Sequence, residues 1–166
     1  MDLSALQEPF GLEGDFEEAM PYGSGHINDT FAAVYNQAGR KVRYIHQRIN
    51  NRVFEDIPRL MENIWRVTRH THLKLEQEGV ADRTRRGLTL VPTGEGMPYF
   101  QDASGRHWRT YLFIEGARTY DRTESALQAK QAARAFGAFQ SRLSDLPAGE
   151  LHETIPDFHN TVSRLD

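Results

Sequence analysis

The chain has 166 residues, 39% hydrophobic and 26% charged, which describes an ordinary globular domain with its own core rather than a disordered protein. Its formal net charge of −3 gives no electrostatic basis for binding nucleic acid or an anionic membrane. The absence of cysteine excludes disulfides, thiolate metal sites and a cysteine nucleophile. No apolar run is long enough to span a bilayer, and residues 1–15 lack the basic start of a secretory signal, so a cytoplasmic location is expected.

The first part of the chain predicts a glycine-marked turn followed by a β-hairpin. Residues 22–25 (Tyr-Gly-Ser-Gly) form a flexible turn. Residues 30–35 are rich in β-formers, residues 36–39 (Asn-Gln-Ala-Gly) supply a turn, and residues 43–49 predict a second strand. Two strands around a short Asn/Gly turn favour an antiparallel pair.

After the hairpin the hydrophobic period changes to that of a helix. Apolar residues recur at helical spacing from Ile57 to Val67. Asp56 is a suitable N-cap, Pro58 is tolerated in the first turn, and Gly79 lies where the helix is expected to end.

The remaining pattern predicts more strands and a second helix. Short strands are expected at 88–92 and around 99–100, a turn at 102–105, and an apolar strand at 107–114. Residues 124–143 predict a helix with one apolar face, formed by Ala129, Ala132, Ala133, Phe136, Phe139, Gln140 and Leu143. A small antiparallel sheet with one long helix packed on it is an α+β arrangement.

Two features could serve phosphate binding, and the residues alone leave both open. Gly23 and Gly25 lie in a turn before a strand, which disfavours a dinucleotide fingerprint but would let backbone amides cover phosphates. On spacing alone, an ordinary flexible turn is the favoured explanation. Arg48 late in the second strand and Glu62 on the helix could form a phosphate-holding cation with its carboxylate partner, or be an unrelated surface pair.

Other polar clusters favour structural readings. The basic run at 83–86 (Arg-Thr-Arg-Arg) is typical of a solvated loop. His70 and His72 lie two apart on a helix and do not share a face, so they make a poor metal pair. A partly exposed loop explains His152, Asp157 and His159 better than a metal site does.

Six collinear segments resemble a known family. They are residues 23–31 (Gly-Ser-Gly-His-Ile-Asn-Asp-Thr-Phe), 44–50 (Tyr-Ile-His-Gln-Arg-Ile-Asn), 60–64 (Leu-Met-Glu-Asn-Ile), 108–116 (Trp-Arg-Thr-Tyr-Leu-Phe-Ile-Glu-Gly), 136–140 (Phe-Gly-Ala-Phe-Gln) and 153–159 (Glu-Thr-Ile-Pro-Asp-Phe-His). In this order they resemble the N-acetylhexosamine 1-kinase branch of the aminoglycoside phosphotransferase family, over about residues 22–164. That family has a two-lobed, protein-kinase-like fold and transfers the γ-phosphate of ATP to a small-molecule hydroxyl.

The resemblance implies a fold and roles for individual residues. Residues 1–116 would be the nucleotide-binding N-lobe and hinge, and residues 117–166 the beginning of the C-lobe. Arg48 would replace the usual strand lysine with Glu62 as its partner, and neighbouring Gln47 or Tyr44 could contribute. The phosphate-covering loop would contain Gly23, Ser24, Gly25, His26 and Asn28. The hinge would be Leu112, Phe113 and Ile114, with Tyr111 or Phe113 against the adenine.

The resemblance also implies what lies outside these residues. The family's catalytic aspartate and its Mg²⁺-binding aspartate are expected beyond residue 166, so no catalytic or metal-binding residue is assigned here. ATP and Mg²⁺ are the implied cofactors, and a sugar is the implied substrate of the full-length protein. We therefore expect this chain alone to be inactive.

Removing the larger lobe would expose apolar surface, which predicts a homodimer through that surface. The alternative function is a non-catalytic, truncated kinase-like module that binds a nucleotide or a protein partner.

Overall fold

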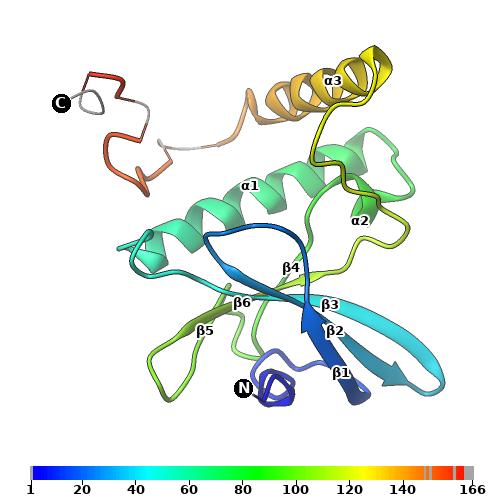
Figure 1. Ribbon diagram of the computed structural model, residues 1–166. Helices are drawn as coiled ribbons and strands as arrows, with labels where there is room; N and C mark the ends of the chain where they lie inside the picture. The colour runs from blue at the N-terminus through cyan, green and yellow to red at the C-terminus, as the bar shows by residue number, and fades with distance from the viewer. Residues whose placement is uncertain (1, 148, 150, 159, 163–166) are drawn as a thin grey trace.

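The computed structural model describes residues 2–147, 149, 151–158 and 160–162 (Figure 1). Six strands form one antiparallel sheet in the order β1-β2-β3-β6-β4, with β5 paired to β6. The strands are β1 (Asp15–Pro21), β2 (Asp29–Gln37), β3 (Arg40–Arg48), β4 (Leu90–Val91), β5 (Phe100–Gln101) and β6 (His107–Leu112). The helices are the 3-10 turn η1 (Ser4–Leu6), α1 (Ile57–Gln77), α2 (Arg83–Arg86) and α3 (Ala126–Leu143). This architecture confirms the predicted α+β class.

The predicted hairpin is confirmed as β2 and β3. Gln37 pairs with Arg40, so the turn consists of Ala38 and Gly39, whose φ angles of 52° and 86° are both left-handed. A two-residue turn of this kind matches the twist of the flanking strands. The Gly39 amide also donates to Asn36 Oδ1 at 2.8 Å, which explains why asparagine precedes the turn.

Helix α1 begins and ends where its capping residues predict. Asp56 Oδ1 accepts a hydrogen bond from the Arg59 amide at 3.0 Å, and Gly79 follows the helix with a φ of +70°. The apolar face of α1 covers one face of the sheet (Figure 1). Its cluster joins residues of the helix, the sheet and the segment after β3, namely Ile57, Leu60, Met61, Leu90, Tyr111 and Ile49.

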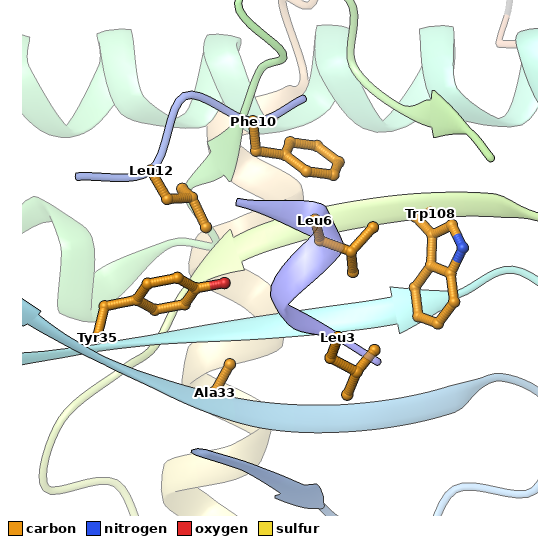
Figure 2. Packing of buried hydrophobic residues seen from close by; sticks show 7 residues of the cluster. All are labelled: Leu3, Leu6, Phe10, Leu12, Ala33, Tyr35 and Trp108. Atoms are coloured by element: carbon orange, nitrogen blue, oxygen red, sulfur yellow. The ribbon is translucent and has the colours of Figure 1, made fainter. Parts of the chain in front are cut away.

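The opposite face of the sheet is covered by residues 3–12, a feature that the sequence reasoning missed. Figure 2 shows Leu3, Leu6, Phe10 and Leu12 packed against the strand residues Ala33, Tyr35 and Trp108. The spacing of Leu3, Leu6 and Phe10 is itself a helical signal. The sheet is therefore sandwiched between the start of the chain and α1.

Strand β1, which was also not predicted, forms one edge of the sheet. Its register against β2 shifts between Phe16 and Glu18, which marks a β-bulge, and the strand ends at Pro21. Gly14 directly precedes β1, and a side chain at this position would lie 2.5 Å from the Asn36 carbonyl oxygen. Gly14 is therefore required by close backbone packing as well as by its φ of +88°.

Helix α3 lies on the outer side of α1, away from the sheet (Figure 1). Arg142 donates to both carboxylate oxygens of Glu78 at 2.8 Å, and Asp145 accepts from Lys74 and lies 3.1 Å from His70. These contacts use one side of α3. Most of its predicted apolar face stays exposed, with Phe136 71% accessible to solvent, whereas Leu143 is half-buried.

Two further predictions from the sequence concern a membrane span and a histidine group near the end of the chain. Among the described residues, no helix is both long and apolar enough to cross a bilayer. His159, the third member of the group formed with His152 and Asp157, lies outside the described residues.

His46 on β3 is completely buried, and its ring lies next to the rings of Phe10 and Tyr35. Its Nδ1 lies 2.9 Å from Thr110 Oγ1 and its Nε2 lies 3.2 Å from the Tyr35 hydroxyl. Each hydroxyl can donate or accept, so a neutral imidazole is fully satisfied. Burial lowers the pKa of His46 from 6.5 to about 4 and raises the pKa of Tyr35 to about 12.

We predict that His46 makes the fold acid-sensitive. The unfolded chain binds a proton at this imidazole below pH 6.5, whereas the folded chain binds it only near pH 4. The stability that the neutral ring contributes above pH 6.5 is therefore lost as the pH falls towards 4. Urea unfolding should show a loss of about 2 kcal/mol from this group between about pH 7.5 and about pH 5. In His46→Gln the loss should shrink by that amount; an unchanged pH dependence would contradict the prediction.

Candidate functional site

A cavity of about 460 Å³ opens between the glycine turn, the sheet and residues 112–114. We call it the hinge pocket. Its lining residues come from β2, β3, β6 and the segments beside them, and are Tyr22, Thr30, Ile45, Gln47, Leu88, Arg109, Tyr111, Leu112, Phe113, Ile114 and Ala117. The volume lies within the range of small-molecule sites.

One end of the hinge pocket has aromatic walls held by cations. The rings of Tyr22 and Phe113 meet edge to face at 5.4 Å, and the Arg43 guanidinium lies 3.9 Å from the centre of the Phe113 ring. Arg43 also forms a two-pronged ion pair with Glu115, which lowers the pKa of that carboxyl. The residues after β6 are therefore fixed to β3 by stacking and charge.

The basic run at 83–86 contributes to this fixation. It forms the short helix α2, in which Arg85 pairs with Asp82 and donates to the main-chain oxygen of Glu115. Gly116 follows with a φ of +65°, and a side chain there would come within 3.3 Å of Arg85 Nη1. The prediction of a simple solvated loop therefore understated this segment, because Arg85 anchors the chain at the pocket.

The main chain at the pocket offers a specific donor. The Leu112 amide donates to Thr89 O at 2.9 Å and the Phe113 amide to Arg43 O at 3.1 Å. Within the described part of the chain, the Ile114 amide has no such bond. Of the three predicted hinge residues, Ile114 is thus the one with an amide free for a ligand.

The other end of the hinge pocket is polar. Gln47 Oε1 accepts from Arg109 Nε at 2.9 Å, and Gln47 Nε2 donates to Thr30 Oγ1 at 2.9 Å. Arg109 is only 9% exposed, and burial lowers its pKa. Three neighbouring strands therefore supply a connected row of donors and acceptors beneath the glycine turn.

The predicted Arg48–Glu62 pair is wrong. Successive side chains of a strand point to opposite faces, and β3 directs Gln47, not Arg48, towards the hinge pocket. Arg48 pairs instead with Asp29, its partner in β2, and lines a separate hollow of about 430 Å³ with His26 and Asn50. Glu62 is 2.8 Å from His152 Nε2.

The glycine turn connects the two hollows. Gly23 has a φ of +83°, and a side chain at Gly23 or Gly25 would meet nothing within 4 Å, so the turn is open on its surface. Ser24 Oγ lies 3.4 Å from Asp121, beyond the predicted hinge. Asn28 Oδ1 accepts from the Asn50 amide at 3.0 Å, which ties the other end of the turn to the end of β3.

Only some of the residues that the resemblance implied line the hinge pocket. Tyr111, Leu112, Phe113 and Ile114 do so, whereas Arg48 and His26 line the separate hollow and Glu62 lies beside His152. Arg109 and Thr30 line the same pocket and are not among the residues that the sequence predicts for the site. The alternation of Arg109 and Tyr111 along the predicted strand was the available signal, because period-two spacing places them on one face.

No protein-family model matches this chain. Its function is therefore argued from the chemistry of the hinge pocket: flat apolar walls and a free amide at one end, and a buried guanidinium with polar neighbours at the other. Such an arrangement suits a ligand with a planar ring and an anionic group.

We predict opposite stability effects for adjacent residues of β3. Gln47→Leu leaves the buried Arg109 Nε without its acceptor, which should lower the free energy of unfolding by about 1–3 kcal/mol. Arg48→Leu removes only an exposed ion pair and should cost less than about 1 kcal/mol. Urea unfolding of the two variants tests this order, and an equal or larger loss in Arg48→Leu would refute the assignment of faces.

Proposed function

We propose that this chain is the nucleotide-binding lobe and hinge of an ATP-dependent small-molecule kinase, whose full-length protein phosphorylates a sugar hydroxyl. The observation that carries the proposal is the hinge pocket, which lies beneath a glycine turn joining two antiparallel strands. Glycine turns in this position cover nucleotide phosphates in protein kinases.

The order of elements supports a protein-kinase-like N-lobe. A strand, a glycine turn and a hairpin are followed by the long helix α1, further strands, a connecting segment and helix α3. This agrees with the order implied by the resemblance to N-acetylhexosamine 1-kinases in the aminoglycoside phosphotransferase family. The assignment to that fold and family is part of the proposal.

The adenine would occupy the apolar end of the hinge pocket. Ile45 and Phe113 provide apolar surface on which a flat base can lie, and the free Ile114 amide provides a directional donor. Because one lobe supplies only one wall of a two-lobed cleft, we expect an ATP affinity no better than roughly millimolar.

The phosphates would extend towards residues 23–28 and the polar end of the pocket. Bound ATP supplies the phosphoryl group, and Mg²⁺ neutralises the charge that develops during its transfer. This chain's residues would bind and orient the nucleotide. The aspartates that hold Mg²⁺ and face the acceptor hydroxyl are proposed to lie outside these residues, so the chain alone is expected to be inactive.

A non-catalytic module is the second candidate, favoured by the exposed face of α3. Ala129, Ala132, Ala133 and Phe136 are all exposed on this helix. In a two-lobed kinase this face would contact the larger lobe. Left uncovered, it would favour association between copies of the chain.

We predict that adenosine and ATP bind in the hinge pocket. Titration of the ¹⁵N-labelled chain should shift the Ile114 amide resonance with both ligands and the Gly23 and Gly25 resonances with ATP. Phe113→Ala should weaken adenosine binding by about tenfold, since it removes an aromatic wall worth about 1–2 kcal/mol.

Phe136→Ala is the matched control, because it removes the same ring from the exposed face of α3. It should bind adenosine as the wild type does. If the Ile114 amide resonance of the wild type does not shift with adenosine or ATP at several millimolar, the nucleotide site is refuted.

We further predict that the α3 face drives self-association. Phe136→Glu places a charge on this face and should shift the chain towards monomer in sedimentation-velocity runs at high concentration. Lys130→Glu changes the charge of the same helix without removing apolar surface and should leave association unchanged. A monomeric wild type at all concentrations would contradict the prediction.

A further inference from the structure

Arg109 is a buried cation whose contacts in the chain are neutral. Its Nε donates to Gln47 at 2.9 Å, its Nη1 lies 3.9 Å from Met61 Sδ, and its guanidinium lies 5.6 Å from the centre of the Tyr111 ring. Among the residues that the structure describes, no carboxylate forms an ion pair with it. Three nearby arginines behave differently, since Arg43, Arg48 and Arg106 each pair with a carboxylate.

Burial without a counterion opposes the charged form of Arg109. The side chain is 9% exposed, and loss of solvent lowers its pKa. Arginine nevertheless stays protonated, because its ordinary pKa is too high for burial of this degree to neutralise it. A guanidinium carries five donors in a planar fork, and the two contacts to Gln47 and Met61 use only part of that capacity.

The side chain of Arg109 lines the hinge pocket, so its charge lies at the pocket wall. It lies on β6 two residues before Tyr111, so both side chains are on the face that carries the pocket, and both line it. Gln47 and Thr30, at the same end, are neutral acceptors and donors rather than competing anions. A negatively charged ligand group would therefore meet a fork of donors on a side chain that is itself shielded from solvent, and hydrogen bonds between two charged groups are strong.

We propose that Arg109 binds a phosphate group of the nucleotide in the hinge pocket, taking the charge-neutralising role that the sequence resemblance implied for Arg48. This inference rests on the proposed nucleotide function. It reassigns the phosphate-binding cation from β3 to β6, with Gln47 orienting the guanidinium through its Nε. Arg48, held by Asp29 outside the hinge pocket, has no part in this contact.

The test compares ligands that differ only in phosphate. The 166-residue chain and its variants are titrated with adenosine and with ATP. In Arg109→Gln, ATP binding should weaken by about tenfold or more, to the level of adenosine, while adenosine binding stays as in the wild type. Arg109→Lys keeps the charge without the fork and should lose less. Arg48→Gln is the matched control and should bind both ligands as the wild type does.

A second measurement on the wild type avoids any effect of substitution on folding. The Nε resonance of Arg109 should shift with ATP and with inorganic tripolyphosphate, and stay in place with adenosine. If adenosine and ATP bind but the resonance is unmoved and Arg109→Gln leaves the ATP-to-adenosine affinity ratio unchanged, the role of Arg109 is overturned and the nucleotide site stands. If the wild type binds neither adenosine nor ATP, the proposed function itself fails and this assignment with it.

Discussion

The alternation of side chains along the paired strands β3 and β6 is the constraint on which the rest of the structure depends. On one face, His46, Trp108 and Thr110 enter the cluster covered by residues 3–12. On the other, Ile45 and Tyr111 join the core beneath α1 and, together with Gln47 and Arg109, line the hinge pocket. Because side chains alternate between the two faces, a shift of one residue in register would move every side chain of these strands to the opposite face.

The same alternation decides which polar groups a ligand can reach. Gln47 and Arg48 are adjacent in sequence, yet one is bonded to a buried guanidinium and the other to an exposed carboxylate. The pocket's charge therefore comes from the central strand β6, where packing on both sides holds the side chain in place. Arg43 and Arg85, which are more exposed, instead bind the carboxylate and the main-chain oxygen of Glu115, respectively. The buried Arg109 is therefore the cation placed to meet a ligand, whereas the exposed Arg43 and Arg85 hold the chain that surrounds the pocket.

The sequence predicted those elements that are defined by turn and capping residues close to them in the chain. The Asn/Gly turn, the Asp56 cap and Gly79 each act within a few residues, so the hairpin and α1 could be placed from them. The covering role of residues 3–12 depends on contacts with strands up to about a hundred positions away, which no local pattern encodes. The error at Arg48 has a similar origin. Charge suggested a phosphate ligand, but only the register of β3 against β2 reveals which face that charge occupies.

The irregular edge strand β1 has a consequence for how copies of the chain can meet. An open strand edge offers unpaired backbone groups on which another strand could add. Here the bulge between Phe16 and Glu18 interrupts the regular spacing, Asp15, Glu17 and Glu18 add negative charge, and Pro21 lacks an amide hydrogen. Such an edge is a poor template for intermolecular strand addition. Growth of the sheet by strand addition at β1 is thereby discouraged.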